Sequence, residues 1–411
     1  MSAPPPAIAA DVLHGIATKR LSEVMTALRV PALTGGIITK DGVVTGATIP
    51  DSLDCRLPFH IGSVAKSFTA LTIDAVCKDE AFFGRLSKTS QLKEFWQGGL
   101  LPPTLADATM EELLNHRSGM EDNVLAYGFT RDVWGACKAV GLLARNGLDV
   151  WSMAQESWIP YKMIDAPDRR SAFHKAMEII QEQSGSRMET VMKANKGHWK
   201  YSNFGVALAA YMAEAATNED FAALMDRYVF KALDLPSAGF GEPYSVDASY
   251  PVGHRTQGLF PSSMRFYSLP PITSCIPHIL IPAGDVHCNV HDLLKFLQFH
   301  LNNFETNTPY YTSGFQPLAG SLGANYINGF VVDDTTSHKK ATGKPVRETD
   351  LPLNFLHDGS TGAWFTYAQF VPEWGLAACI MTNACPYTVH APVLRGTRDM
   401  LLDAAREKGL K

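Results

Sequence analysis

The first part of the chain has the apolar spacing of a helix followed by that of two strands. Between residues 10 and 29 the apolar side chains recur every three or four positions, which predicts an amphipathic helix. Residues 32–39 and 43–49 are rich in β-branched side chains and flank Asp41 and Gly42. Because an Asp-Gly pair readily adopts the positive φ angles of a tight turn, these two segments are predicted to form a β-hairpin.

The far end of the chain has the reverse order. Residues 363–370 and 376–382 are apolar and β-rich, and residues 371–375 between them carry a proline and a glycine. A helical period follows from residue 393 to about residue 408. We therefore expect the two ends to build one antiparallel sheet between helices.

The middle of the chain is predicted to be mainly helical. Five segments there have a helical period, with few convincing strands between them: residues 64–78, 110–115, 170–183, 205–215 and 221–232. The predicted fold class is α/β (α+β), an antiparallel sheet flanked by helices plus a mainly helical inserted domain. The predicted α/β domain is discontinuous, with residues 1–70 and 285–411, and residues 71–284 form the helical domain. Ligand sites favour the cleft at such a junction.

Charge and composition exclude several classes of function. The 411 residues include 36 Lys and Arg against 41 Asp and Glu, so the net charge of -5 gives no reason to expect nucleic acid or an anionic membrane as a partner. No apolar run is long enough to predict a transmembrane helix. Residues 1–10 lack the positive charge that opens a signal peptide, and the seven cysteines include no C-x-x-C pair. We expect a cytoplasmic protein with reduced thiols.

A serine and a lysine one helical turn apart are the first chemical signal. Ser63 opens a predicted helix and Lys66 follows three residues later, so their side chains share a face. A lysine whose pKa is lowered by burial can take the proton of a serine hydroxyl and make it a nucleophile. The N–H groups at the helix start can stabilise the negative charge that develops. S-x-x-K also occurs at Ser90 and Ser337, but in polar stretches, whereas the Ser63 helix is apolar enough to be buried.

A second signal is the pair Tyr201 and Asn203, just before an apolar helix. A tyrosine beside ammonium groups can act as a general acid or base, and the asparagine can hold a substrate carbonyl or the lysine. The same Y-x-N spacing recurs at Tyr326 and Asn328, where both residues are predicted to lie in a strand and to share one face of it.

A third signal is the polar stretch His357, Asp358, Gly359 and Ser360. A glycine-rich strand start can bring backbone N–H groups beside a reacting carbonyl. The N–H of Ser360 together with that of Ser63 would then form an oxyanion hole. The alternative is that this stretch is only a polar bulge or turn before a strand.

In this order the three signals resemble the serine β-lactamase and penicillin-binding-protein superfamily, most closely its class C-like branch of esterases, acyltransferases, D-aminopeptidases and class C β-lactamases. Residues 112–119 are similar to the L-L-x-H-x-S-G of that family, and the resemblance covers most of the chain. It implies that Ser63 is the acylated nucleophile, that Lys66 accepts its proton, and that Tyr201 passes a proton to the leaving group.

The resemblance assigns supporting roles to two further positions. It implies that Asn203 positions the reacting groups. It also implies that His116, with its neighbours Ser118 and Gly119, shapes a turn rather than taking part in the chemistry.

One departure from the family bears on the substrate. Where β-lactamases and carboxypeptidases carry K-T-G, this chain has His357, Asp358 and Gly359, similar to the H-x-G of D-aminopeptidase and some esterase-like members. A histidine with an ordinary pKa of roughly 6.5 is mostly neutral at pH 7 and does not hold a substrate carboxylate as lysine does. The predicted substrate-binding residues are Asn203, His357, Asp358, Gly359 and Ser360.

The predicted function is a serine hydrolase or acyltransferase that acts on an ester, thioester or neutral amide of a small metabolite. We expect this metabolite to belong to specialised metabolism. A β-lactamase or D-amino-acid peptidase would keep the mechanism and change the substrate. A binding or assembly module would keep the fold without the chemistry, although the retention of Ser63, Lys66 and Tyr201 argues against it. The patterns predict no oligomeric state.

Two aromatic stretches would either roof the cleft for a lipophilic or aromatic acyl substrate or pack into their own core. The first belongs to a candidate lid within residues 120–200 and the second to a proline-rich loop. Their members are Tyr127, Phe129, Trp134, Trp151, Trp158 and Tyr161, and then Phe260, Phe266, Tyr267, Pro270, Pro271 and Ile272.

No cofactor and no metal is predicted. The chain has neither a P-loop nor G-x-G-x-x-G, and it lacks the G-x-S-x-G of an α/β-hydrolase. His287, Cys288 and His291 have a spacing that can bind zinc. However, Asn289 and Asp292 are predicted to be a helix N-cap and its N3 partner, which places the two histidines on different faces.

Overall fold

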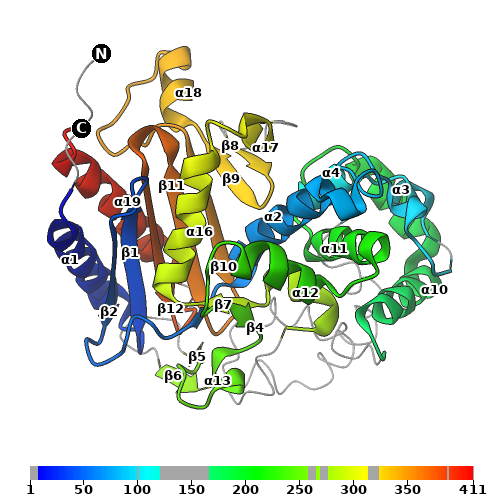
Figure 1. The fold of residues 1–411 in the computed structure, drawn as a ribbon, viewed down its shortest axis with the longest axis horizontal. Helices are drawn as coiled ribbons and strands as arrows, with labels where there is room; N and C mark the ends of the chain where they lie inside the picture. The colour runs from blue at the N-terminus through cyan, green and yellow to red at the C-terminus, as the bar shows by residue number, and fades with distance from the viewer. Residues whose placement is uncertain are drawn as a thin grey trace.

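A seven-stranded antiparallel sheet forms the frame of the protein (Figure 1). The computed structural model describes residues 8–99, 101–120, 166–257, 265–268, 276–312, 324–386 and 388–410. The strands lie in the order β2-β1-β12-β11-β10-β9-β8. Their bounds are β1 (Leu33–Thr39), β2 (Val44–Ile49), β8 (Ala324–Ile327), β9 (Phe330–Asp333), β10 (Asn354–Ser360), β11 (Phe365–Val371) and β12 (Leu376–Thr382). Because β1 pairs with β12, the two ends of the chain meet in one sheet, as predicted.

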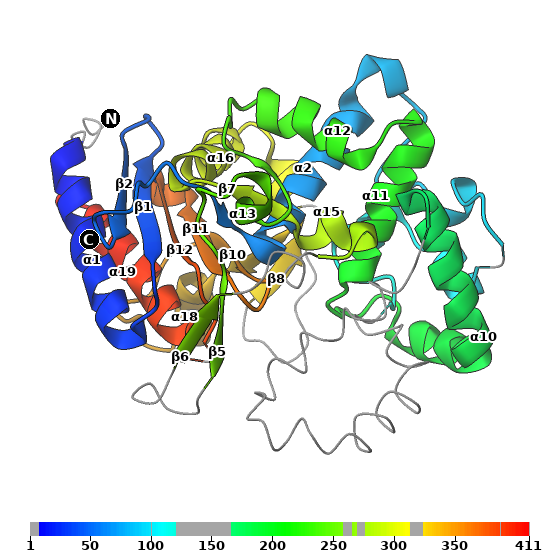
Figure 2. The same ribbon diagram turned by 90° about the horizontal axis from the view of Figure 1, so that it is seen from below.

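Helices cover both faces of this sheet (Figure 2). Helices α1 (Ala10–Leu28) and α19 (His390–Glu407) pack on one face, and α16 (Val290–Asn303) packs on the other. The period of two along β12 assigns its side chains to the two faces. Ile380 packs with Leu21 of α1, whereas its neighbour Cys379 belongs to the same core as Leu294 of α16. The predicted α/β fold class is confirmed.

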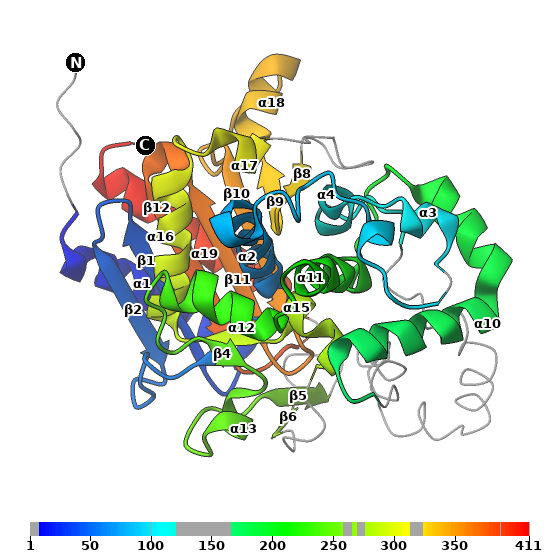
Figure 3. The same cartoon turned by 45° about the vertical axis from the view of Figure 1, so that its right-hand side comes forward.

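A mainly helical part lies beside the sheet (Figure 3). Its helices are α2 (Ala65–Lys78), α3 (Pro103–Ala106), α4 (Met110–Leu114), α10 (Arg169–Asn195), α11 (Asn203–Thr217) and α12 (Phe221–Met225), which continues as a π-helical turn (Asp226–Lys231). A buried ion pair between Arg169 and Glu214, 2.7 Å, ties α10 to α11. Glu214 also accepts the N–H of Phe221 at the start of α12. The division into an α/β domain of residues 1–70 and 285–411 and a helical domain of residues 71–284 stays a prediction.

The remaining elements are short. They are β3 (Phe59–His60), β4 (Gly239–Phe240) and β7 (Val286–Cys288) in a second sheet, β5 (His254–Gln257) and β6 (Arg265–Ser268) in a third, helices α13 (Pro243–Val246), α15 (Ile281–Gly284), α17 (Thr308–Thr312) and α18 (Thr335–Thr342), and 3-10 turns at Gly62–Val64, Glu80–Phe82, Leu92–Glu94, His278–Leu280 and Pro372–Trp374. In the part of the chain described, no helix is long and apolar enough to cross a lipid bilayer.

The structure excludes one alternative for His357 and overturns one expectation for Asn328. The stretch that begins at His357 is not a bulge or turn, because Asn354–Ser360 forms a regular strand between β9 and β11. Asn328 does not share a strand face with Tyr326, because β8 ends at Ile327 and Asn328 turns with a left-handed φ of 48°. Asparagine tolerates the left-handed conformation better than most residues, which suits Asn328 to the β8–β9 turn.

Other predictions concern segments away from the sheet. Asn289 is the N-cap of α16 and its side chain accepts the N–H of Asp292, as predicted, and His287 lies before the helix in β7. Residues 121–165, which hold the first aromatic stretch and most of the candidate lid, lie outside the described residues. So does most of the second stretch, of which Phe266 packs half-buried against the α1–α19 core.

Buried histidines make the stability of this fold depend on pH. Burial lowers the pKa of His300 to about 3 and that of His287 to about 4. Unfolding would return these groups to ordinary values near roughly 6.5. Since the unfolded chain binds the protons first, acidification below that value favours unfolding.

We expect each such histidine to lower the free energy of unfolding by about 2 kcal/mol when the pH falls from 7 to 5. Replacing His300 by Gln removes one of them, so the variant should lose about 2 kcal/mol less over this range than the wild type. Urea unfolding at both pH values measures the difference. Equal losses in the two proteins would contradict the assignment of His300 as a buried neutral group.

Candidate active site

Ser63 lies where the second sheet leads into α2, in the 3-10 turn that precedes this helix. Lys66 Nζ, one turn further on, donates to Ser63 Oγ at 2.9 Å. The Tyr201 hydroxyl donates to the same oxygen at 2.7 Å. Lys66 is 1% exposed. The structure therefore brings together the three side chains that the sequence predicts to do the chemistry.

Lys66 has two further partners from distant parts of the chain. Its Nζ donates to Asn203 Oδ1 and to the carbonyl oxygen of Ala283, each at 2.6 Å. Asn203 is the first residue of α11, whose N-cap is Ser202, and Ala283 lies in α15. Asn203 thus lies against the lysine, as the sequence predicts, whereas the carbonyl of Ala283 was not anticipated, because backbone acceptors carry no residue signature.

Two glycines let strand β10 approach the Ser63 turn. Gly62 has a φ of 52°, and a Cβ added to it would lie 2.5 Å from the N atom of Ser360. A Cβ added to Gly359 would lie 2.7 Å from the N atom of Ser63 and would overlap the carbonyl oxygen of Ile61. Only glycine fits at either position. The backbones of Ser63 and Ser360 are consequently held side by side.

His60 supports this turn from behind. Its Nδ1 accepts the N–H of Gly62 at 3.1 Å, so its proton resides on Nε2, which faces Asp285 Oδ1 at 3.3 Å. Burial raises the pKa of Asp285, and the bond to His60 opposes that rise. Neither residue was singled out from the sequence, although a histidine three positions before the nucleophile is a signal that could have been tested.

The alternation of β10 separates its polar side chains. Asp358 and Ser360 are paired in register with Tyr367 and Phe365, which belong to the core under α1 and α19. Their side chains therefore lie on the opposite face of the sheet from Gly359. Ser360 Oγ lies 3.1 Å from Cys385 Sγ on that face. The prediction that the Asp358 side chain binds substrate is thus not supported by its placement, and Ser360 offers its backbone.

His357 lies on the same face of β10 as Gly359, but its ring is already hydrogen-bonded. Nδ1 faces the carbonyl oxygen of Asp358, which can only accept, so this nitrogen carries the proton. Nε2 then accepts from the hydroxyl of Tyr326 at 3.3 Å. Burial, aided by the charge of Lys66 and opposed by Asp358, lowers the pKa of His357 to about 4. The imidazole is neutral at pH 7.

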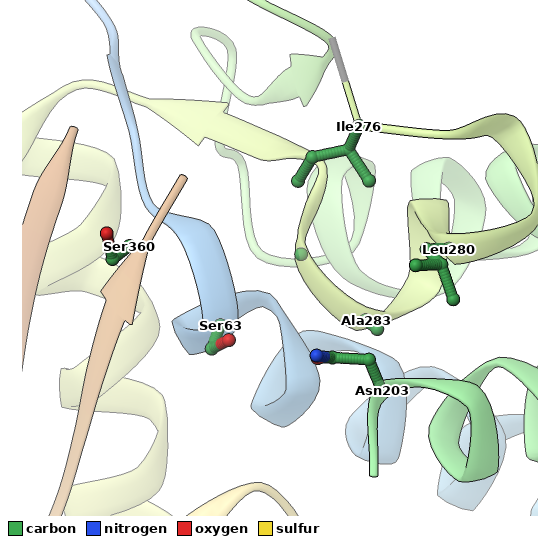
Figure 4. A pocket seen from close by; sticks show the side chains of 7 residues that line it. Ser63, Asn203, Ile276, Leu280, Ala283 and Ser360 are labelled. Carbon is green, nitrogen blue, oxygen red and sulfur yellow. The ribbon is translucent and has the colours of Figure 1, made fainter. Parts of the chain in front are cut away.

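A pocket opens beside these groups (Figure 4). Figure 4 shows Ser63 and Asn203 on one side of it and the apolar Ile276 and Leu280 on the other. Its described lining is Ser63, Asn203, Ile276, Leu280, Ala283, Gly284 and Ser360. None of these seven residues is charged. Within the described ranges no group of three His, Cys, Asp or Glu side chains is placed to hold a metal ion.

The family assignment follows from a match over most of the sequence. The beta-lactamase family model matches residues 24–396. The chain belongs to the beta-lactamase family. Membership in this family supports a serine hydrolase, in agreement with a serine, a lysine and a tyrosine in direct contact. A search of curated proteins found no significant match.

Solved structures of several beta-lactamase relatives share the fold. An octameric penicillin-binding protein homologue from Pyrococcus abyssi is 19% identical with a TM-score of 0.65, over 96% of this chain and 77% of that one. A D-stereospecific amidohydrolase from a Streptomyces species is 16% identical with a TM-score of 0.59, over 90% and 94%. A beta-lactamase from Sulfitobacter sp. EE-36 is 15% identical with a TM-score of 0.63, over 98% and 100%. At these identities the likeness concerns the fold alone.

The close approach at Gly359 gives a test of this beta-lactamase-type site. Gly359→Ala should push β10 away from the Ser63 turn and displace one N–H donor, which typically costs roughly 10² to 10³ in rate. The rate at which a fluorophosphonate modifies Ser63 measures the effect without a known substrate.

Gly15→Ala is the matched control, because a Cβ there meets no atom within 4 Å. Its labelling rate should equal that of the wild type. If Gly359→Ala were labelled equally fast, the close packing of β10 would have no part in the reactivity of Ser63.

Proposed function

We propose that the protein is a serine hydrolase or acyltransferase that acts on an ester, thioester or neutral amide of a small molecule through an acyl-enzyme at Ser63. The observation that carries this proposal is the pair of short contacts at Ser63 Oγ, 2.9 Å from Lys66 Nζ and 2.7 Å from the Tyr201 hydroxyl. A serine hydroxyl becomes a nucleophile when a base is in hydrogen-bond reach of it.

The geometry supports Lys66 as that base. Asn203 Oδ1 and the carbonyl of Ala283 can only accept, so each takes an N–H of the amine. When the amine loses a proton, the direction of its bond to Ser63 reverses, because the lone pair then faces Ser63 Oγ and the serine O–H donates to it. As Ser63 Oγ bonds to the substrate carbonyl carbon, its proton passes to Lys66 Nζ.

Tyr201 and two backbone N–H groups complete the step. The Tyr201 hydroxyl gives its proton to the leaving oxygen, sulfur or nitrogen as the carbonyl bond breaks, and Lys66 returns the serine proton to the phenolate. The N–H groups of Ser63 and Ser360 stabilise the oxyanion. Water or an acceptor alcohol or amine then attacks the acyl-enzyme by the reverse proton transfers, which releases an acid or a transferred acyl product.

The chemistry of His357 supports a substrate without a carboxylate next to the scissile bond. Its imidazole is neutral, and both ring nitrogens are bonded within the protein, to Asp358 O and the Tyr326 hydroxyl. A neutral, engaged ring offers no cation to such a carboxylate. Esters, thioesters and neutral amides do not require one.

The pocket wall supports an apolar acyl group. Ile276, Leu280 and Ala283 line the space beside Ser63 and are buried, and Ile276 and Leu280 belong to the core that includes α11. Apolar walls with a few polar groups are typical of small-molecule sites. We propose a lipophilic acyl substrate, with no nucleic acid, membrane or cofactor as a partner.

A β-lactamase or D-amino-acid amidase is the second candidate. Family membership and the similarity in fold to a beta-lactamase and a D-stereospecific amidohydrolase favour it. It would use the same Ser63 chemistry, so only substrates separate the two proposals. A binding or assembly module is the third candidate, and it predicts no turnover.

A p-nitrophenyl ester and a chromogenic cephalosporin, assayed side by side, discriminate these candidates. We expect turnover of the ester, little or no turnover of the cephalosporin, and a loss of ester kcat/KM of at least roughly 10³ in Ser63→Ala. Ser337→Ala is the matched control, because Ser337 also precedes a lysine by three residues but is exposed on α18, and it should be fully active.

The other outcomes assign the other functions. Faster turnover of the cephalosporin than of the ester would establish the second candidate. Absence of any turnover in the wild type would favour the third candidate, a binding or assembly module. Equal activity of Ser63→Ala and the wild type would overturn the proposed nucleophile.

A further inference from the structure

His116 occupies a position that its motif alone does not explain. It follows α4 in a left-handed conformation with a φ of 59°, and it is 1% exposed. A non-glycine residue in this conformation costs stability, so the conformation persists only where the surrounding structure imposes it. The preceding residue, Asn115, accepts the N–H of Asn328 through its side chain, which ties this turn to the β8–β9 turn.

His116 accepts hydrogen bonds from both residues that flank Tyr201. Its carbonyl oxygen accepts the N–H of Lys200 at 2.7 Å, and its ring Nδ1 accepts the N–H of Ser202 at 3.2 Å. The backbone on each side of Tyr201 is therefore attached to one residue. Anchors at the residues before and after Tyr201 restrict the two backbone dihedral angles that orient its side chain.

The ring of His116 also contacts Tyr201 directly. The centroids of the two rings lie 4.7 Å apart, the ring centroid of Tyr326 lies 4.5 Å from that of the imidazole, and Trp199 packs edge-on at 6.1 Å. Tyr326 in turn is bonded to His357 on β10. His116 thus packs against both Tyr201, which contacts Ser63, and Tyr326, which contacts β10 through His357.

We propose that His116 is a positioning residue that holds the Tyr201 hydroxyl against Ser63 Oγ by accepting the N–H groups of Lys200 and Ser202. This inference rests on the proposed function, since it assigns a purpose to the position of Tyr201 in that reaction. It goes beyond a turn-forming role, because it requires the imidazole acceptor as well as the bend of the backbone.

The charge state of His116 agrees with this role. Nδ1 can accept from Ser202 only if it carries no proton, so the ring is the neutral Nε2–H tautomer. The ionisable groups that face it are Lys66 on α2, Tyr201, Tyr326 on β8 and His357 on β10. Burial, then the charge of Lys66, then His357, keep the pKa of His116 well below its ordinary value.

The test compares two esters that form the same acetyl-enzyme. Phenolate is a stronger base than p-nitrophenolate, so its departure depends more on proton donation by a general acid. A variant that mispositions Tyr201 should therefore lose kcat/KM for phenyl acetate and retain most of it for p-nitrophenyl acetate. A variant that only disturbs the fold should lose both alike.

Two variants of His116 distinguish the effect of its imidazole from that of its left-handed backbone conformation. His116→Gly keeps the left-handed φ without strain and removes the ring. We expect its kcat/KM for phenyl acetate to fall by about 10- to 100-fold and that for p-nitrophenyl acetate by less than about threefold. His116→Asn tolerates the same φ, and its Oδ1 can replace Nδ1 as acceptor, so it should recover at least part of the loss.

A double-mutant cycle keeps the test decisive even if one variant folds poorly. Tyr201→Phe removes the hydroxyl, and adding His116→Gly or His116→Asn to it should lower phenyl acetate kcat/KM no further. His300→Gln, a buried histidine packed against Phe296 and bonded to Tyr311, is the control for lost stability and should leave the ratio of the two esters unchanged.

Equal losses with both esters, or additive losses in the cycle, would overturn the role of His116. A wild type that turned over p-nitrophenyl acetate but not phenyl acetate would also overturn it, because no proton would then be delivered through Tyr201. Failure of the proposed function has a separate signature, which is full activity in Ser63→Ala.

Discussion

A buried amine at the meeting point of three chain segments is the constraint on which the site depends. An amine with 1% exposure needs partners, because a polar group buried without them costs several kcal/mol. Lys66 finds them in Ser63, in Asn203 at the start of α11, and in the carbonyl of Ala283 in α15. The contacts that satisfy the amine therefore fix the nucleophile, the segment that carries Tyr201, and one wall of the pocket relative to one another.

Close packing of β10 against the Ser63 turn brings a second backbone segment to the site. Gly62 and Gly359 have no side chains, so β10 lies directly against the turn of Ser63 and brings the backbone of Ser360 to it. The same strand carries His357, whose neutral ring is bonded within the protein on both sides. In the proposed reaction, one strand would supply an N–H to the developing oxyanion and would place no positive charge beside the substrate. This combination suits neutral acyl substrates.

Local patterns were enough to predict the sheet from both chain ends and the contact of Ser63 with Lys66, because i and i+3 spacing and an Asp-Gly turn are properties of short segments. Bringing Tyr201 to Ser63 required the family resemblance, since 138 residues separate them. The sequence did not show which way Asp358 points: a period of two along β10 places its side chain on the opposite face of the sheet from Gly359, and its predicted part in substrate binding stays a prediction. The contacts of His116 with Lys200 and Ser202 could not be predicted, because nothing in the turn after α4 indicates which distant backbone it meets.

The most direct test of the central claim is where an acyl group attaches. Wild type and Lys66→Ala are mixed with p-nitrophenyl acetate, quenched with acid, and analysed by intact mass and peptide mapping. The account predicts one acetyl group on Ser63 in the wild type and far slower acetylation in Lys66→Ala. Acetylation of a different residue, or equal rates in the two proteins, would contradict it.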